Sequence, residues 1–547
     1  MRIKLPFYIF FIAFITVVAD AHSQQFQRLY GGVSQEISLV ALPSPTGGIY
    51  FLGATTSAGS GNADPTLMKL DDDGQVIWAR TIGGVYYDVA GAMTIASDGG
   101  LVCAGSSSSF NGNTLNDLYF FKVDSTGDMV WSKTFSAGDL DIASALLRTA
   151  DNGYAITGFT RIGGLKKVLL IRTDANGDTL YTGIYGGVGD DQGVEFLETA
   201  DGGFVIIGKT FTQTLGESDI LMMRTDANGN LVWSKSFGGS LWDEAAGITM
   251  LADGNYFISG STISFGQGDF DILLMKTDTS GNILWGKTYG MEETDASYTA
   301  LENDDGTIVI SGYTNCMGFG QTLRMSDPNY YLDGDRGDDS TNVLLMKINA
   351  VGDTLWTRTY GDESKDEALH FVKMPDGGYL IPGQTNSLNF SNDSLQMYLI
   401  RTDSMGYSGC HEQDAHPIID MTNFITQTLV IAQSSGFTVN AVTSISLAWN
   451  VIAEDACIFS SVNEIADNAF DVYPNPASGN INIVNRNSGI EKIEMYNLLG
   501  ESIFSKILSS PSLETSIDVS GYVPGIYFIT ISSASSTATK KIIIQKN

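Results

Sequence analysis

The 547-residue chain is poor in the side chains that most often carry enzyme chemistry, with four histidines and four cysteines. Beyond the first 23 residues only His370, His411 and His416 remain, which leaves zinc sites and histidine-based triads short of residues. No glycine-rich loop precedes a helical pattern, so nucleotide binding has no support. We therefore expect no catalytic residues and no enzyme.

Basic residues are also scarce, because 30 lysines and arginines stand against 62 acidic residues and give a net charge of −32. This balance excludes nucleic acid and anionic lipid as partners. The one long apolar run, 5–18, follows Arg2 and Lys4 and precedes Ala19, Ala21 and Ser23. Residues 1–23 are therefore predicted to be a signal peptide, which implies export through the periplasm, and no transmembrane segment is expected.

The sequence contains no long segment with the periodicity of an α-helix. It contains instead a repeated unit of short strand patterns. An aromatic residue recurs before each Tyr-Gly-Gly-like turn, at Phe26, Trp78, Trp131, Tyr181, Trp233, Trp285 and Trp356, with spacings of 50 to 53 residues and a last spacing of 71. Each repeat contains four short strand patterns, an Asp-Gly-Gly-type turn and an Asp-x-x-Gly turn. Such units are typical of β-propeller blades.

The two ends of the repeat array complement each other. The first copy has an extra strand, 26–30, and the last copy, at Asp403, has no aromatic strand after its turn. The N-terminal strand is expected to complete the last sheet and so leave no open edge. Residues 24–409 are thus predicted to form a seven-bladed β-propeller closed by the N-terminal strand.

Residues 410–468 lack the repeat and are interpreted as a linker. Cys410 and Cys457 bracket this segment, and in an exported protein we expect them to form a disulfide. Cys103 is interpreted as a buried thiol and Cys316 as an incidental one.

Residues 469–547 contain seven short strand patterns and are predicted to form a small immunoglobulin-like β-sandwich. The blocks DVYPNPASGNINI, IEMYNLLGESIFS, VPGIYFITI and KKIIIQKN resemble the type A C-terminal sorting domain of the type IX secretion system. The resemblance implies a Bacteroidetes-type bacterium, an outer-membrane translocon and its sortase as partners, and release or attachment at the cell surface. The motif falls on Pro474, Asn475, Pro476, Gly500, Gly525, Tyr527 and Lys541, where the prolines and glycines also fix turns. The repeats themselves are similar to bacterial delta-60-like propeller repeats, which implies a fold and no activity.

Loops between the second and third strands of the repeats vary in length and share one face of the predicted ring. Variable loops on a rigid frame favour binding. The longest, 314–341, supplies the ligand-binding candidates Tyr330, Tyr331, Asp333, Asp335, Asp338 and Asp339. Its carboxylates permit a calcium site, but the calcium-loop pattern fails at Gly337, so a solvated acidic loop is the favoured interpretation and no cofactor is expected.

An acidic residue occurs at the same place in every repeat, six positions after the start of the Tyr-Gly-Gly-like turn: Glu36, Asp88, Asp141, Asp191, Asp243, Asp295 and Asp366. Because one ligand site would not need seven copies, we predict structural hydrogen bonds at the blade junctions. The alternative is an acidic ring that binds a cation.

The sequence predicts a monomeric, secreted or cell-surface protein that binds an extracellular carbohydrate or protein through its loop face. One alternative is a carbohydrate-active enzyme, a glycosidase or lyase, on the same frame, since a glycosidase needs only two carboxylates. A second alternative is a structural adhesion component without a small ligand.

Overall fold

The computed structural model describes residues 25–456 and 470–545. The gaps are 111–115, 215, 267–268, 291–293, 316–340, 362–363, 389–393, 414–417, 422–424, 435, 443, 450, 476, 486–489, 498–501, 524 and 534–536. The chain divides into two compact units, Met1–Cys457 and Ile458–Asn547. The described residues are all strand, turn or irregular, without a helix, which confirms the prediction of an all-β chain.

The first three repeats each form one antiparallel four-stranded meander. Sheet 1 contains β2 (Glu36–Pro43), β3 (Ile49–Thr55), β4 (Asp64–Leu70) and β5 (Val76–Gly83). Sheet 2 contains β6 (Asp88–Ile95), β7 (Leu101–Ser107), β8 (Asp117–Val123) and β9 (Met129–Ser136). Sheet 3 contains β10 (Asp141–Arg148), β11 (Tyr154–Ile162), β12 (Leu165–Thr173) and β13 (Thr179–Gly186).

The next three repeats follow the same order. Sheet 4 contains β14 (Asp191–Glu198), β15 (Phe204–Thr210), β16 (Asp219–Thr225) and β17 (Leu231–Gly238). Sheet 5 contains β18 (Asp243–Met250), β19 (Tyr256–Thr262), β20 (Asp271–Thr277) and β21 (Ile283–Gly290). Sheet 6 contains β22 (Asp295–Glu302), β23 (Ile308–Thr314), β24 (Asn342–Ile348) and β25 (Thr354–Tyr360).

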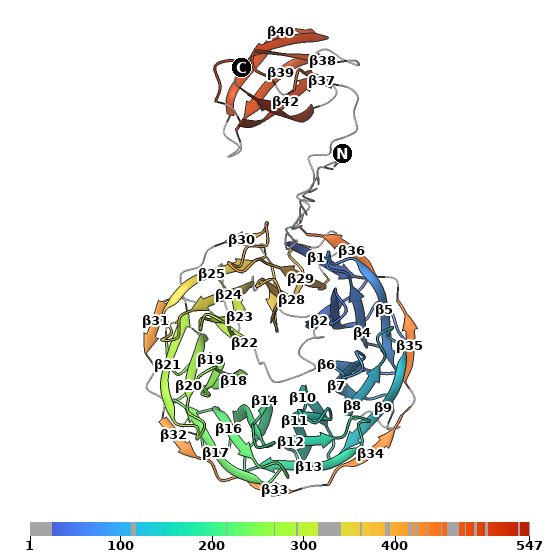
Figure 1. Ribbon diagram of the computed structural model, residues 1–547, viewed down its shortest axis with the longest axis vertical. Coiled ribbons are helices and arrows are strands. Elements are labelled where there is room, and N and C mark those ends of the chain that lie inside the picture. Colours follow the sequence, from blue (N-terminus) through green and yellow to red (C-terminus); the bar gives the residue numbers. More distant parts are fainter. Residues whose placement is uncertain are drawn as a thin grey trace, which may run out of the picture. The chain divides into compact units, whose positions relative to one another are not determined.

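Sheet 7 joins the two ends of the repeat array. It contains β26 (Asp366–Ala368), β27 (Val372–Lys373), β28 (Tyr379–Thr385) and β29 (Gln396–Arg401), and its next strand is the N-terminal β1 (Phe26–Gly31). In the β1–β29 pairing Phe26 lies opposite Arg401 and Tyr30 opposite Met397. The first strand of sheet 1, β2, contacts β6 of sheet 2 and also β28 of sheet 7, and β26 of sheet 7 contacts β24 of sheet 6. Figure 1 shows the sheets side by side around a ring.

Side chains also connect neighbouring sheets at the Asp-x-x-Gly turns. Gly229 has φ +78°, and a Cβ there would lie 2.6 Å from the Tyr181 ring of sheet 3, so both the turn and the packing require glycine. Tyr185, also from sheet 3, donates its hydroxyl to the Gly229 carbonyl at 2.5 Å. Tyr30 and Tyr289 make the equivalent bonds to Gly74 and Gly352 at 2.7 and 2.6 Å.

The segment 412–455, which we call the belt, adds one outer strand to every sheet. Its strands are β30 (Glu412–Gln413), β31 (Ile418–Met421), β32 (Ile425–Thr428), β33 (Ala432–Ser434), β34 (Thr438–Ala441), β35 (Ile445–Ala448) and β36 (Ile452–Asp455). They pair in turn with β25, β21, β17, β13, β9, β5 and β1, so the belt follows the ring in the direction opposite to the repeats (Figure 1). The interpretation of this segment as a linker is therefore wrong.

The belt is held by edge pairing and by apolar side chains between its strands. Leu429, 4% exposed, packs against residues of sheets 3 and 4, and Phe437 packs against sheets 2 and 3. Val442 and Trp449 pack in the same way further along. Each belt strand is at most four residues long, and the side chains of β32, β33 and β34 are mostly exposed, so the sequence shows little of the alternation that marks a strand.

The C-terminal unit consists of two sheets around one core. One sheet contains β37 (Phe470–Tyr473), β38 (Asn480–Asn485) and β41 (Glu514–Asp518). The other contains β40 (Ser502–Ser512), β39 (Ile490–Tyr496), β42 (Gly525–Ser533) and β43 (Thr537–Ile544). Ile483, Ile493, Ile529 and Ile542 are fully buried between them. In the part of the chain that the structure describes, no helix has the length and apolar character needed to cross a membrane.

Candidate functional site

A cavity of about 280 Å³ lies at the centre of the ring, lined mainly by the first strand of each sheet. Strands β2, β6, β10, β14, β18 and β22 each contain a register shift three residues after their first residue. Such a bulge turns an extra side chain out of the regular alternation. The bulged residues that line the cavity are Leu39, Gly91, Ser144, Val194, Ala246 and Tyr298.

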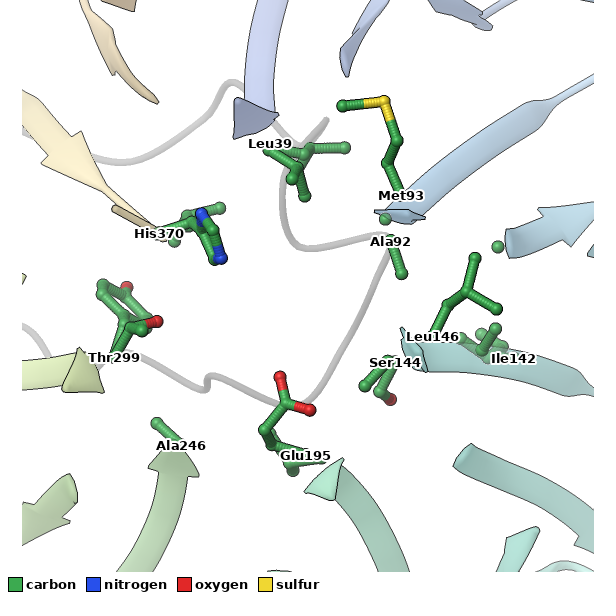
Figure 2. Close-up of a pocket in the computed structure, with 18 of the residues that line it drawn as sticks. Leu39, Ala92, Met93, Ile142, Ser144, Leu146, Glu195, Ala246, Thr299 and His370 are labelled. Atoms are coloured by element: carbon green, nitrogen blue, oxygen red, sulfur yellow. The ribbon is translucent and has the colours of Figure 1, made fainter. Parts of the chain in front are cut away.

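The lining of this cavity is divided into an apolar side and a polar side. Sheets 1 to 3 contribute mainly apolar side chains, such as Leu39, Met93, Ile142 and Leu146, together with the hydroxyl groups of Ser106 and Ser144. The sheets that follow contribute the apolar Val194, Ala245, Ala246 and Leu369 and most of the polar groups, namely Gln192, Glu195, Lys209, Glu244, Tyr298, Thr299 and His370. Figure 2 shows the Glu195 carboxylate pointing into the cavity, with His370 and Thr299 across from Met93 and Leu146. The seven repeats are thus alike in backbone and different where they meet the cavity.

Glu195 is the carboxylate that departs most clearly from the repeat. The residue four positions after the repeated acid is small, apolar or uncharged in five repeats, namely Val40, Ala92, Ala145, Gly247 and Thr299. Glu195 is half-buried, and its Oε1 accepts a hydrogen bond from the Phe196 amide at 2.8 Å. Burial raises the pKa of Glu195 to about 7.

His370 occupies the equivalent position of the seventh repeat, between β26 and β27. Burial lowers the pKa of His370 to about 4, so its ring is neutral at physiological pH. Its Nδ1 atom is buried and makes no hydrogen bond within the described residues. A neutral imidazole that lines the cavity can donate or accept a hydrogen bond with a ligand.

A buried ion pair forms part of the cavity wall in sheets 4 and 5. Lys209 Nζ and Glu244 Oε1 are 3.0 Å apart, and the side chains are 4% and 9% exposed. The ammonium lies 5.9 and 5.7 Å from the ring centres of Phe211 and Trp242, which pack edge to face. Because the two charges compensate each other, this wall is polar without net charge.

The seven repeated acids are buried and lie apart from the cavity lining. Asp191, for example, accepts from the Gly187 amide at 2.7 Å, from Thr210 Oγ1 at 2.5 Å and from Thr212 Oγ1 at 3.1 Å, all in its own repeat or the preceding turn. Asp243 makes the same contacts with Gly239, Thr262 and Ser264. This geometry supports the structural prediction over a ring that faces the channel.

The loop that carries Tyr330, Tyr331, Asp333, Asp335, Asp338 and Asp339 lies outside the described residues, and so does the calcium site considered there. The signal peptide lies outside them as well. Glu195 and His370 were missed at the sequence level, although aligning the repeats position by position would have shown both as exceptions.

Cys410 is disulfide-bonded, whereas Cys103 is a buried free thiol. Cys457 and Cys316 lie outside the described residues. Ala456, which precedes Cys457, has its carbonyl oxygen 3.1 Å from the Nε2 atom of His411, the residue that follows Cys410. The Cys410–Cys457 pairing stays a prediction, which this proximity supports.

In the C-terminal unit, two of the sorting-motif residues tie loops to strands. Asn475 Oδ1 accepts from the Ile543 amide at 2.7 Å, and the Tyr527 hydroxyl donates to the Val523 carbonyl at 2.7 Å. Pro474 and Gly525 are exposed. Pro476 and Gly500 lie outside the described residues, and for Lys541 only the backbone, in β43, is described.

Residues 471–545 match the family model of the secretion system C-terminal sorting domain. The resemblance predicted from the sequence is confirmed, and the chain is a secreted or cell-surface protein that interacts with the type IX secretion machinery.

The remaining likenesses are distant. The regulatory protein FlaEY of Caulobacter vibrioides is 23% identical over 171 residues, which cover 29% of this chain and 17% of that protein, so the chain spans less than a fifth of this curated relative. Among solved structures, an α-L-arabinanase of Penicillium chrysogenum has a TM-score of 0.36 at 11% identity, covering 57% of this chain and 92% of the arabinanase. Sqt1 of Chaetomium thermophilum has a TM-score of 0.37 at 11% identity, covering 70% and 99%. Scores this low carry no conclusion about activity.

Proposed function

We propose that the exported chain folds as a seven-bladed β-propeller, closed by β1 and encircled by the belt, and binds a small carbohydrate in its central cavity without catalysis. The C-terminal unit directs export and takes no part in binding. The propeller is a rigid frame, and the ligand contacts come from the residues that differ between repeats.

The single observation that carries this proposal is the divided lining of the cavity. A sugar presents C–H faces to apolar side chains and hydroxyl groups to polar ones. Met93 and Leu146 supply an apolar wall, and Glu195, Thr299 and His370 supply hydrogen-bonding groups across from it. The small volume favours one small molecule over a folded partner, since ligand cavities usually begin near 300 Å³.

The charge state of the lining supports an uncharged ligand. His370 is neutral at physiological pH, Glu195 is only partly ionised near neutrality, and Lys209 compensates Glu244. A strongly anionic or cationic ligand would find no opposite charge to pair with in such a cavity.

A glycan array probed with the purified chain tests this function. We expect the chain to bind a saccharide on the array and Ala246→Phe to lose this binding. The bulged Ala246 faces the cavity, and a phenylalanine ring there would fill it. The matched control is Ala432→Phe on the exposed surface of the belt. Binding that survives Ala246→Phe would place the ligand elsewhere, and an empty array would argue against carbohydrate.

A carbohydrate-active enzyme is the second candidate, and one observation favours it. Glu195 and Glu244 line the same cavity in different environments, since burial raises the pKa of Glu195 to about 7 and Lys209 holds Glu244 in an ion pair. Glycoside hydrolysis uses two carboxyl groups in different environments, one of which acts as an acid. A hydrolase screen with Glu195→Gln separates the two candidates, because an enzyme loses turnover and keeps binding.

A further inference from the structure

Two buried aspartates face each other where sheet 1 meets sheet 2. Asp64 begins β4 and Asp88 begins β6, and the side chains are 1% and 0% exposed. Asp64 Oδ1 and Asp88 Oδ2 lie 2.0 and 2.8 Å from the position that a Cβ on Gly83 would take. Two ionised carboxylates this close in a buried place repel each other unless a positive charge joins them.

The arrangement recurs where sheet 4 meets sheet 5. Asp219 Oδ1 and Asp243 Oδ2 lie 2.4 and 2.9 Å from the Cβ position of Gly238. Asp117 with Asp141 and Asp271 with Asp295 stand at the same positions of their repeats. Four of the seven junctions therefore carry two acids.

The other three junctions each replace one of the acids. Lys167 takes the place of Asp64 beside Asp191, and Asn342 and Gln396 take that place beside Asp366 and Glu36. The Lys167 ammonium donates to the carbonyls of Gly187 and Gly189 at 2.5 and 3.0 Å. At one junction the chain thus supplies its own cation, and at two others it removes one negative charge.

Hydrogen bonding at Asp64 leaves one oxygen unused. Its Oδ2 accepts from the amides of Ser60 and Gly61 at 2.8 and 3.1 Å, whereas its Oδ1 is buried without a partner among the described residues. Asp88 Oδ2 accepts from the Gly84 amide and Ser109 Oγ, both at 2.7 Å. Buried carboxylate oxygens normally have partners, and Asp64 Oδ1 is therefore placed to accept a hydrogen bond or to bind a cation.

Backbone carbonyls that match those around Lys167 are present at the Asp64 junction. Gly84 and Tyr86 are the counterparts of Gly187 and Gly189 in the repeat, and their carbonyl oxygens lie 3.2 and 1.8 Å from the Cβ position of Gly61. Carboxylate and carbonyl oxygens are the ligands that calcium prefers, and the net charge of −32 attracts cations.

We propose that a calcium-like divalent cation binds between Asp64 and Asp88, at the place that the Lys167 ammonium takes between sheets 3 and 4, and that the Asp219–Asp243 junction holds an equivalent site. The cation joins adjacent sheets at the same end as the variable loops. This inference does not depend on the ligand of the central cavity.

Equilibrium dialysis of the chelator-treated full chain with calcium tests the proposal, together with melting temperatures with and without calcium. We expect calcium to bind and to raise the melting temperature. Asp64→Lys, which copies Lys167, and Asp64→Asn, which copies Asn342, should each bind one ion fewer, with affinity at that junction falling at least about tenfold. Both variants should fold, because the chain already carries these residues at other junctions.

Asp335→Asn is the matched control for the acidic loop considered at the sequence level. Calcium lost in Asp335→Asn and kept in Asp64→Lys would overturn the proposal. Absence of calcium binding to the unaltered chain would also overturn it. So would an infrared band of a protonated carboxyl group that is present in the calcium-saturated protein and absent from Asp64→Asn, because a shared proton and not a cation would then join the two aspartates.

Discussion

At the scale of single residues, burial favours the uncharged forms of Glu195 and His370 in the cavity. Burial moves the pKa of Glu195 up to about 7 and that of His370 down to about 4, so both side chains are neutral between these values. Neither shift requires an opposite charge nearby. A hydrogen-bonding lining of this kind is matched to hydroxyl groups better than to ions.

Replacing Glu195 by glutamine should stabilise the protein at high pH. Since the pKa of Glu195 is 4.5 ordinarily and about 7 in the fold, the wild type loses stability as pH rises from about 4.5 to 7, where only the unfolded chain is ionised. Because Glu195→Gln lacks this loss, its unfolding free energy above pH 7 should exceed that of the wild type by about 1 to 3 kcal/mol. The lower part of this range reflects the partial exposure of Glu195. Thermal unfolding across pH measures it, with the exposed Glu217→Gln as control. Parallel profiles for wild type and Glu195→Gln would contradict the account.

We predict that Asp191 stabilises the fold through its hydrogen bonds and does not contact the ligand. Three donors converge on its carboxylate, so Asp191→Asn replaces a charged acceptor and turns one amide donor toward other donors. We expect a loss of about 2 kcal/mol in unfolding free energy, measured by urea titration, with ligand affinity unchanged. Reduced affinity in a fully stable variant would instead support the acidic-ring alternative.

At the scale of elements, the belt gains its stability from small anchors between short strands. Leu429 is buried between sheets 3 and 4, whereas the next residue, Val430, is 69% exposed. Leu429→Ala should lower the unfolding free energy by about 2 to 5 kcal/mol, and Val430→Ala should change it little. Equal effects of the two substitutions in urea unfolding would show that the belt does not pack as described.

The predicted Cys410–Cys457 disulfide would join the two ends of the belt. Closing a loop of this length restricts the unfolded chain, so Cys410→Ser should cost about 2 to 4 kcal/mol. Mass spectrometry of the unreduced protein tests the pairing first, and a Cys410–Cys316 peptide would refute it. Reduction should then lower the melting temperature of the wild type and leave that of Cys410→Ser unchanged.

Strands are predicted well from the sequence where the same pattern occurs in every repeat. The strand order of each repeat and the pairing of β1 with β29 follow from landmarks such as Trp233 and Asp226, each of which recurs around the ring. The strands of the belt were not predicted because strands such as β33 have only three residues and exposed side chains. Glu195 and His370 could not be predicted from features that the repeats share, because each differs from the residues at the same position of the other repeats.

At the scale of the whole molecule, the two units separate their tasks. The C-terminal unit matches an export signal, and the ring of sheets contains the cavity and the junctions at which we propose cation binding. The belt pairs with the outer strand of each sheet in the ring, such as β17 and β21, so that the open edges belong to strands of at most four residues. This arrangement reduces the risk of edge-to-edge association in a protein that leaves the cell.

Hydrogen–deuterium exchange of the full chain with and without a saccharide found on the array tests the central claim most directly. We predict slower exchange on binding in the cavity-lining segments 193–196, 244–247 and 368–371, which come from three different sheets. Protection confined to the loop at 316–340, with these three segments unchanged, would contradict a binding site at the centre of the ring.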